Sequence, residues 1–288
     1  MPQTIPKKKV RKPQQVGKAQ KGKEEKMQPM PVYEKEKIPF RLRDKVAIIT
    51  GGDSGIGRAI AIAFAKEGAD VVICYEKDDV DAKITASEIE KNGRKCLLIG
   101  GDVSRENHCQ KIIDRTIKTF GKIDVLINNA AEQTPQDELK KISAQQLRRT
   151  FEVNIFSQFY MSKAVEKYLK KGSSIINTTS VTAYRGSGHL LDYSATKGAI
   201  LAFTRSLSSY FSDKGIRVNA VAPGPIWTPL IPTTFDPEEV ATFGSNVPMK
   251  RAGQPVEVAY AYVFLASDDA AYITGQCIHP NGGEIVNG

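Results

Sequence analysis

From residue 45 onward, short runs of β-branched and other apolar residues alternate with longer amphipathic segments. Short apolar runs rich in Val and Ile are typical of strands that are buried on both faces of a sheet. Strands that alternate with helices form βαβ units, which make the sheet parallel and cover both of its faces. The expected strands are 45–50, 69–75, 95–100, 123–129, 173–180, 216–223 and 276–280. The predicted fold class is therefore α/β, with a single doubly wound domain over residues 45–288.

Amphipathic segments between these runs predict the helices, and several of them end in Gly, which accepts the left-handed conformation of a helix cap. The expected helices are 57–68, 81–93, 107–121, 145–172, 193–215 and 255–267. We find no internal repeat in the sequence. In a doubly wound sheet the ligand lies beyond the carboxyl ends of the strands, so we expect the functional residues just after strands.

The first 44 residues differ in composition from the rest of the chain. They hold 13 Lys and Arg against 5 Asp and Glu, whereas residues 45–288 hold 28 against 27. This segment is rich in Lys, Gln and Pro and has no apolar periodicity, so we predict a basic, low-complexity N-terminal extension. Its P-K-K-K-V-R-K string is similar to a nuclear localisation signal, but short basic runs usually carry only solvated charge. Because the predicted domain is nearly neutral, a nucleic-acid partner is not expected.

The sequence favours a cytoplasmic protein. It contains no run of about eighteen apolar residues, as a membrane span would need, and its N-terminus lacks the apolar core of a signal peptide. The four cysteines (Cys74, Cys96, Cys109 and Cys277) form no CxxC pair, and the three histidines lie far apart. We therefore expect reduced thiols, no disulfide framework and no metal site.

The segment T-G-G-D-S-G-I-G, residues 50–57, follows the first expected strand and opens the first helix. Gly51, Gly55 and Gly57 permit a tight turn and a close approach of the backbone to a pyrophosphate, and the helix N-terminus offers free N–H groups. The spacing is neither G-x-G-x-x-G nor that of a P-loop. A glycine-rich turn without a ligand is the alternative, but the position after the first strand of a βαβ series favours a dinucleotide.

Tyr193 and Lys197 form a second candidate site, since residues at i and i+4 share one face of a helix. The spacing alone suits a solvated helix face as well as a reaction centre.

Several motifs in chain order resemble those of the classical short-chain dehydrogenase/reductase family. They are T-G-x-x-x-G-I-G at 50–57, Asp102-Val103, N-N-A-A at 128–131 with Ala131 in place of Gly, Asn154 in V-N-I-F, Ser180, Y-x-x-x-K at 193–197, R-V-N-A-V-A-P-G at 217–224 and N-G-G at 281–283. The resemblance covers essentially all of residues 45–288. It is greatest to a bacterial branch whose members carry a long N-terminal extension.

This resemblance implies a seven-stranded parallel sheet in the order 3-2-1-4-5-6-7. It also implies a homotetramer, with interfaces at helices 143–171 and 193–213 and at the C-terminal strand. The implied activity is that of an oxidoreductase, which transfers a hydride between a nicotinamide cofactor and a small to medium carbonyl compound or secondary alcohol. The alternative is a dinucleotide-binding sensor or scaffold without turnover, which would need no proton donor.

The resemblance assigns catalytic roles to four residues. Tyr193 is the general acid/base, and the ammonium of Lys197 favours its phenolate by a Coulomb interaction. Ser180 hydrogen-bonds the substrate oxygen, and Asn154 belongs to a proton-relay water site. In isolation, Ser180 and Asn154 could equally be a strand cap and a buried core amide.

Most of the expected cofactor-binding residues lie at or just after strand ends. They are Gly51, Asp53, Ser54, Gly55, Ile56, Gly57, Tyr75, Glu76, Asp102, Val103, Asn129, Ala130, Tyr193, Lys197, Pro223, Gly224, Ile226 and Thr228. Tyr75 occupies the position where an acid usually marks NAD, and Ser54 stands where NADP enzymes often have Arg or Lys. Residues 76–79 carry three carboxylates and one lysine, which would repel a 2′-phosphate. We therefore expect NAD in preference to NADP.

Substrate contacts are expected from three segments. These are Glu132 and Gln133, residues 181–191, and residues 227–248, which are rich in Pro and Thr and suit a lid. Five side chains suggest a partly apolar pocket, although each could also be a core residue: Leu190, Leu191, Trp227, Leu230 and Phe235. The sequence does not identify the substrate.

Overall fold

The computed structural model of the chain describes residues 40–286. Most of the predicted N-terminal extension therefore lies outside the described residues, and the division at residue 44 stays a prediction. Residues just before that division pack on the folded domain. Leu42 is fully buried, and Arg41 forms an ion pair with Glu67 at 2.5 Å.

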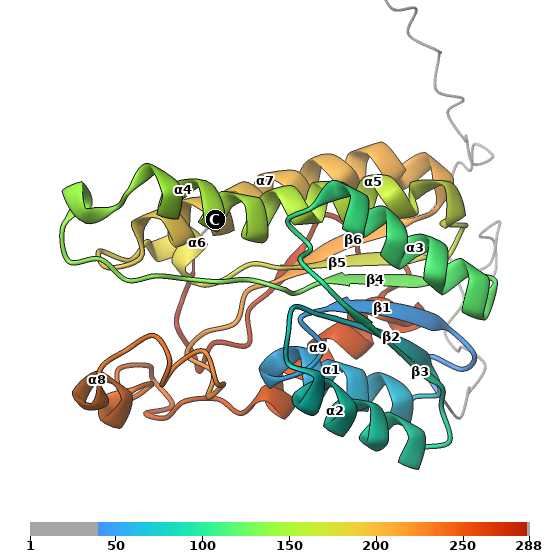
Figure 1. Ribbon diagram of the computed structural model, residues 1–288, viewed down its shortest axis with the longest axis horizontal. Helices are drawn as coiled ribbons and strands as arrows, with labels where there is room; N and C mark the ends of the chain where they lie inside the picture. Colours follow the sequence, from blue (N-terminus) through green and yellow to red (C-terminus); the bar gives the residue numbers. More distant parts are fainter. Residues whose placement is uncertain (1–39, 287–288) are drawn as a thin grey trace, which may run out of the picture. The chain divides into compact units, whose positions relative to one another are not determined.

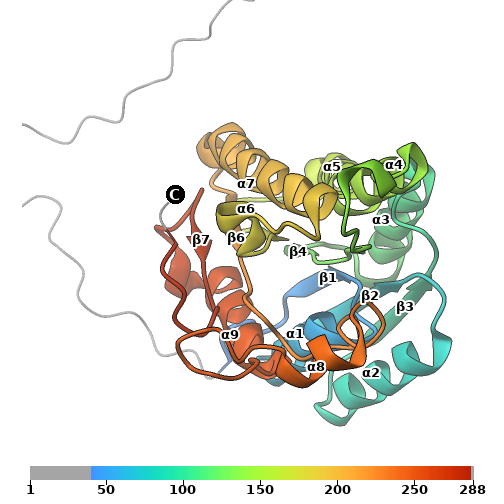
Figure 2. The same cartoon turned by 90° about the vertical axis from the view of Figure 1, so that its left-hand side faces the viewer.

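The seven strands form one parallel sheet in the order β3-β2-β1-β4-β5-β6-β7 (Figures 1 and 2). This order confirms the predicted topology. The strands are β1 (Val46–Thr50), β2 (Asp70–Tyr75), β3 (Cys96–Gly100), β4 (Val125–Asn128), β5 (Ser174–Thr178), β6 (Arg217–Val221) and β7 (Cys277–Ile278). Thr50 pairs in register with Cys74 of β2, and Asn128 pairs with Asn177 of β5. The carboxyl ends of neighbouring strands therefore meet at one edge of the sheet.

Helices cover both faces of this sheet. They are α1 (Gly55–Lys66), α2 (Asp79–Lys91), α3 (Glu106–Phe120), α4 (Ala144–Phe151), α5 (Ser157–Val165), α6 (Thr182–Arg185), α7 (Leu191–Phe211), α8 (Pro237–Thr242) and α9 (Pro255–Ala266). In Figure 1, α1, α2 and α9 lie on one face of the sheet, and α3, α5 and α7 lie on the other. Both faces are covered, so most residues of the strands are buried, as the apolar runs in the sequence predict.

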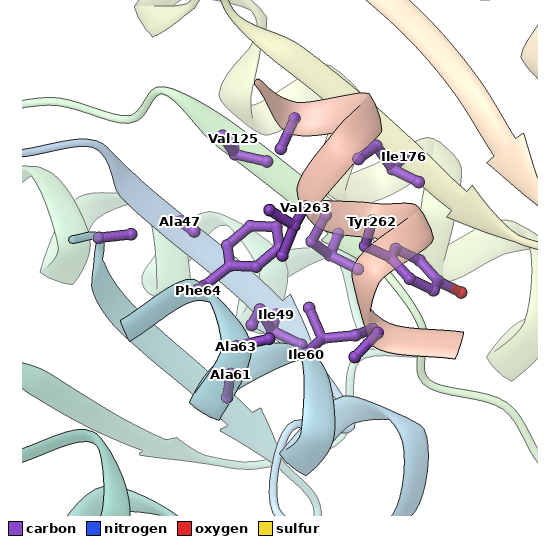
Figure 3. Packing of buried hydrophobic residues seen from close by; sticks show 14 of the residues in the cluster. Ala47, Ile49, Ile60, Ala61, Ala63, Phe64, Val125, Ile176, Tyr262 and Val263 are labelled. Carbon is purple, nitrogen blue, oxygen red and sulfur yellow. The ribbon is translucent and has the colours of Figure 1, made fainter. Parts of the chain in front are cut away.

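Aliphatic and aromatic side chains fill the space between the sheet and the helices. On one face, Phe64 of α1 and Tyr262 of α9 pack over Ile49 of β1, and all three are fully buried (Figure 3). Burying one such side chain contributes about 1.5–3 kcal/mol to stability. The Tyr262 hydroxyl lies 2.7 Å from the hydroxyl of Thr178 at the end of β5. The core thus reaches directly to the strand end that precedes Ser180.

The helix predicted over 145–172 is interrupted, and the prediction of one continuous helix is wrong. A π-helical turn, Glu152–Phe156, separates α4 from α5, and a 3₁₀ turn, Glu166–Tyr168, follows α5. The Ser157 hydroxyl donates a hydrogen bond to the carbonyl of Val153 within this segment. A π turn holds an extra residue, and such turns are frequent at functional sites. Asn154 lies at the centre of this one.

Candidate active site

The glycine-rich loop lies at the carboxyl end of β1, against the N-terminus of α1. A Cβ on Gly57 would lie 1.8 Å from the carbonyl oxygen of Gly51, so only glycine fits there. Gly51 itself has a φ of +63°, which favours glycine. Ser54, the residue before α1, makes no capping hydrogen bond with its side chain. The first N–H groups of α1 are therefore not capped by that side chain, and an anion would suit them.

Asn129 and Ala130, which follow β4, hold this loop in place through hydrogen bonds. The Asn129 amide donates hydrogen bonds to the carbonyls of Thr50 and Gly51, both at 3.1 Å. The backbone N–H groups of Asn129 and Ala130 both donate to the Thr50 hydroxyl, at 2.9 and 3.0 Å. These contacts keep the loop in its tight conformation.

The loop after β6 closes over the glycine-rich loop from the other side. A Cβ on Gly55 would meet the Thr228 side chain at 3.2 Å, so the two loops are in near contact. Gly224 packs on the Asn281 backbone, where a Cβ would lie 2.7 Å from the Asn281 Cα. Ile226 pairs with Gly253 as an isolated bridge. The segments around Pro223, Gly224, Ile226 and Thr228 are thus held in place at both ends.

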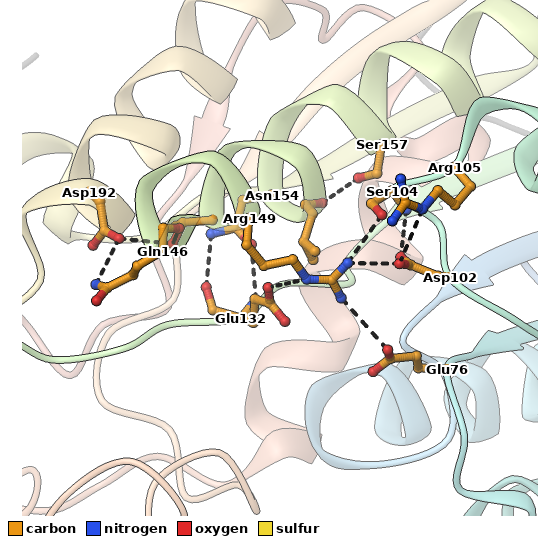
Figure 4. A network of polar contacts seen from close by, with 12 residues as sticks. Glu76, Asp102, Ser104, Arg105, Glu132, Gln146, Arg149, Asn154, Ser157 and Asp192 are labelled. Atoms are coloured by element: carbon orange, nitrogen blue, oxygen red, sulfur yellow. Dashed lines mark hydrogen bonds and ion pairs between the residues drawn. The ribbon is translucent and has the colours of Figure 1, made fainter. Parts of the chain in front are cut away.

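One end of the site, which we call the charged end, consists of Glu76, Asp102, Glu132 and Arg149 (Figure 4). The Arg149 guanidinium lies 2.7 Å from a carboxylate oxygen of Asp102, 2.7 Å from Glu132 and 3.6 Å from Glu76. These carboxylates follow three different strands. No local sequence pattern marks Arg149, because its partners are distant in the chain.

Opposing influences set the pKa values at the charged end. Burial works to raise the pKa of Asp102, but the backbone N–H of Ser104 and the guanidinium of Arg149 outweigh it and hold that pKa below its ordinary value. For Glu132, burial prevails over the charge of Arg149 and raises the pKa above its ordinary value. Tyr75 is turned toward α2, where its hydroxyl donates to Asp79 at 2.6 Å. Glu76 is therefore the strand-two acid at this end.

The other end, which we call the tyrosine end, consists of Ser180, Tyr193 and Lys197. Ser180 follows β5 and is 8% exposed, and Lys197 is 1% exposed. The Lys197 ammonium donates to the carbonyl of Thr178 at 3.0 Å and lies 5.1 Å from the centre of the Tyr193 ring. Ser180 and Tyr193 line the same cavity, and the Ser180 hydroxyl acts to lower the pKa of the Tyr193 phenol. The structure thus brings together the three residues that the sequence predicted as a unit.

Burial dominates the ionisation of this pair. It lowers the pKa of Lys197 to about 7, and it raises the pKa of Tyr193 to about 12, against the hydrogen bond from Ser180. The sequence analysis expected the Lys197 ammonium to favour a phenolate. In the protein by itself, loss of hydration favours the neutral form of both groups. That Lys197 favours the phenolate of Tyr193 stays a prediction.

Asn154 lies behind this end, and it is fully buried. Its side-chain oxygen accepts from the backbone N–H of Glu132 at 2.9 Å, and its amide donates to the Glu132 carbonyl at 2.9 Å. The amide also donates to the Thr196 hydroxyl at 3.1 Å. Asn154 therefore ties the segment after β4 to α7.

Asp192, the residue before Tyr193, is a buried carboxylate that the sequence analysis did not single out. It accepts hydrogen bonds from the Tyr193 backbone N–H at 2.8 Å, the Thr150 hydroxyl at 2.8 Å and the Gln146 amide at 3.1 Å. These contacts join the start of α7 to α4. The signal that the sequence offered was an Asp directly before the expected catalytic Tyr.

A single cavity of about 680 Å³ joins the two ends. All the predicted site residues line it except Gly57, which packs behind the loop, and Asn154. Of the expected apolar substrate contacts, Leu190, Leu230 and Phe235 line it. Leu191 and Trp227 do not, and they are 40% and 44% exposed. Their predicted contact with the pocket is therefore wrong.

The lid expected at 227–248 contains α8 and borders the cavity through Phe235 and Phe243, whose rings lie 6.2 Å apart. Glu132 and Gln133 also line the cavity, as expected. The carboxylate of Glu132 is paired with Arg149, however, and so belongs to the charged end. Among the helices of residues 40–286, none has the length and apolar content that a membrane span needs.

Comparisons with known proteins agree with this geometry. The family model described as enoyl-(acyl carrier protein) reductase matches residues 51–284. A glucose and ribitol dehydrogenase of Daucus carota is 51% identical over 284 residues, which cover 96% of this chain and 98% of that protein. The chloroplastic NADPH-dependent aldehyde reductase 1 of Arabidopsis thaliana is 51% identical over 278 residues, which cover 93% and 96%.

A solved structure has the same fold. A short-chain dehydrogenase from Burkholderia cenocepacia, in complex with NADP, superposes with a TM-score of 0.80 at 31% identity. The match covers 84% of this chain and 98% of that one. With the sheet order, the glycine-rich loop and the Ser180, Tyr193 and Lys197 cluster, these matches place the chain in a family: it is an oxidoreductase of the short-chain dehydrogenase/reductase family.

Proposed function

We propose that the protein interconverts a small to medium carbonyl compound and the corresponding secondary alcohol, with a nicotinamide dinucleotide bound along the cavity. The observation that carries this proposal is the convergence of Ser180, Tyr193 and Lys197 on one cavity with the glycine-rich loop. The Ser54 side chain does not cap the start of α1, and the loop is so tight that only glycine fits at position 57. Both features suit a bound pyrophosphate. A sensor or scaffold would need no such proton donor, so we do not favour that alternative.

The residues of the tyrosine end have distinct tasks in this proposal. Ser180 donates a hydrogen bond to the substrate oxygen and holds it within reach of the Tyr193 hydroxyl. Tyr193 takes the proton when an alcohol is oxidised and returns it when a carbonyl is reduced. The bound nicotinamide ring supplies or accepts the hydride. Lys197 holds Tyr193 in place and would bind the nicotinamide ribose.

Asn154 has a positioning role. It holds both backbone groups of Glu132 and the hydroxyl of Thr196, one turn after Tyr193. We assign it, as the sequence suggested, to a site that orders water for proton exchange between Tyr193 and solvent.

The remaining predicted residues would hold the cofactor. Gly51, Asp53, Ser54, Gly55, Ile56 and Gly57 would surround the pyrophosphate, with Asn129 and Ala130 beneath them. Tyr75, Glu76, Asp102 and Val103 would border the adenosine, and Pro223, Gly224, Ile226 and Thr228 would face the nicotinamide. All of these except Gly57 line the cavity.

We propose NAD as the preferred cofactor. The charged end holds three carboxylates around Arg149, and a 2′-phosphate there would meet a surplus of negative charge. Lys77 and Arg105 lie near Glu76 and Asp102, but their side chains are 82% and 68% exposed, so solvent screens them. The names of the Arabidopsis relative and the Burkholderia structure point to NADP for those proteins. We base the choice of NAD over NADP on the surplus of carboxylates at the charged end of this chain.

The test is an absorbance assay of nicotinamide reduction and oxidation, with NAD and NADP run side by side. The panel contains glucose, ribitol, simple secondary alcohols, ketones and aldehydes, because the relatives are named for a sugar, a polyol and aldehydes. We expect turnover of at least one class, with a higher kcat/KM for NAD. Binding of NAD without turnover of any class would favour the sensor, and a strong NADP preference would refute the cofactor assignment.

We further propose a cytoplasmic homotetramer. Phe156, Phe159 and Tyr210 on the α4, α5 and α7 side of the molecule are 42%, 51% and 57% exposed, and apolar surface of this kind suits a subunit interface. The C-terminal strand β7 is the other expected interface. Sedimentation at micromolar concentration should give four subunits, and a monomer would refute the assembly.

A further inference from the structure

The charged end depends on a single arginine. Arg149 of α4 directs Nη1 to Asp102, Nε to Glu132 and Nη2 to Glu76, at 2.7, 2.7 and 3.6 Å (Figure 4). Nη1 also donates to the Ser104 hydroxyl at 3.1 Å. The planar, forked guanidinium suits this task, because its donors point in fixed and different directions. A lysine carries its three donors on one nitrogen and lacks this fixed, spread-out geometry.

Two of these three carboxylates belong to residues assigned above to the adenosine. Tyr75, at the usual position of the ribose-binding acid, is engaged with Asp79. Glu76 is the acid that remains at the end of β2, and Asp102 is the acid at the end of β3. Arg149 is therefore in contact with the carboxylates that would border the adenosine on two sides.

Electrostatic repulsion explains why these carboxylates need a cation between them. Like charges that share a half-buried site push each other toward solvent. The other cations nearby are less able to prevent this: Lys77 lies 3.2 Å from Glu76 but is 82% exposed, and Arg105 lies 4.0 Å from Asp102 and is 68% exposed. The Arg149 side chain is 33% exposed. Among residues 40–286, only Arg149 contacts all three acids.

The third carboxylate links the charged end to the other parts of the site. Glu132 contacts Arg149 through its side chain, while both of its backbone groups are held by Asn154. The backbone of Glu132 therefore stays in place when Arg149 is changed, and a change at Arg149 should act mainly on cofactor affinity.

We propose that Arg149 is a positioning residue for cofactor binding: its guanidinium holds Glu76 and Asp102 in the orientation that receives the adenosine half of the dinucleotide. The inference rests on the proposed function, since it assumes that the adenosine lies at the charged end. It adds a residue that no sequence motif indicated.

ADP-ribose is a suitable probe, because it carries the adenosine and the pyrophosphate but no nicotinamide. Its affinity is measured by titration calorimetry for the full-length protein, for Arg149→Met and for Arg148→Met. Arg148 is the exposed neighbour on the same helix and provides a matched control. We expect Arg149→Met to weaken ADP-ribose binding by at least about tenfold, and Arg148→Met to leave it within about twofold. The kcat of Arg149→Met at saturating NAD should stay within about threefold of the wild type.

A second readout separates positioning from general damage. Without Arg149, the charge of Glu76 is less balanced, so NADP binding should weaken more than NAD binding. A purely structural defect would weaken both equally. Arg149→Lys keeps the charge and most of the volume, and we expect an intermediate loss of ADP-ribose affinity with an unchanged melting temperature. If Arg149→Met fails to fold, the ADP-ribose affinity of Arg149→Lys tests the proposal.

Unchanged ADP-ribose affinity in either folded Arg149 variant would overturn the inference, as would an equal loss of NAD and NADP affinity. A wild-type protein that binds neither ADP-ribose nor NAD would instead refute the proposed function. The two failures are therefore distinguishable.

Discussion

The two ends of the cavity are built from different kinds of contact. At the tyrosine end, Ser180 and Lys197 are almost fully buried, and Lys197 is held by a backbone carbonyl at the end of β5. At the charged end, half-exposed side chains from three strand ends meet around Arg149. Backbone contacts fix the first end rigidly, whereas charge balance maintains the second. The first end suits chemistry, which needs fixed geometry, and the second suits recognition of a cofactor.

The largest expected effect is at the tyrosine end. Tyr193→Phe removes the only proton donor that we assign to the reaction, so kcat should fall by about 10²- to 10⁴-fold. Cofactor affinity should change little, because the ring stays in place. Steady-state kinetics and NAD titration measure the two quantities. Tyr210→Phe, at a tyrosine that is 57% exposed, serves as the control and should keep full activity.

The buried lysine makes stability depend on pH. The pKa of Lys197 is about 7 in the folded protein, against about 10.4 in an unfolded chain. Between these values the unfolded chain binds more protons, so this residue makes the folded state more stable as pH rises. At pH 7 its burial opposes folding, and near pH 10.4 it does not.

Lys197→Met should remove this dependence. The difference in unfolding free energy between variant and wild type should favour the variant more at pH 7 than at pH 10, by several kcal/mol at about 1.4 kcal/mol per pH unit. Urea titrations at the two pH values measure it, with exposed Lys83→Met as the control. Parallel pH profiles for wild type and Lys197→Met would mean that the ammonium is not desolvated.

A smaller effect is expected at Asp192, whose carboxylate joins the start of α7 to α4. Asp192→Asn replaces one acceptor oxygen by an NH2 donor, which would face either the Tyr193 backbone N–H or the Gln146 amide, so that two donors meet. We expect a loss of about 1–3 kcal/mol in the free energy of unfolding and a reduced kcat with an unchanged affinity for NAD. Exposed Asp114→Asn is the matched control. If Asp192→Asn has wild-type stability and kcat, the carboxylate does not position Tyr193.

The contrast between the two ends also explains what could be predicted from the sequence. The strand order and the members of the tyrosine end were predictable, because the motifs that resemble the short-chain dehydrogenase/reductase family imply both. Arg149 was not, because its three partners come from distant strand ends and no spacing connects them. The π turn at Glu152–Phe156 escaped prediction because helical periodicity does not reveal one inserted residue.

The orientation of individual side chains was equally hard to predict. Glu132 and Tyr75 occupy the expected loops, but their polar groups pair with Arg149 and Asp79. Trp227 and Leu191 lie in the expected segments and face outward. Burial also raises the pKa of Tyr193 to about 12, an effect that the sequence does not show. Each of these depends on three-dimensional packing that a linear pattern does not contain.

The most direct test of this account is the double variant Tyr193→Phe/Arg149→Met, compared with the two single variants. The single-turnover rate of hydride transfer at saturating cofactor and the affinity for ADP-ribose are measured for each. If the two ends act independently, the double variant should combine the rate loss of Tyr193→Phe with the affinity loss of Arg149→Met, additive within about 0.3–0.5 kcal/mol. A double variant no worse than one of the single variants, or a single variant that loses rate and affinity together, would contradict the division of tasks between the tyrosine end and the charged end.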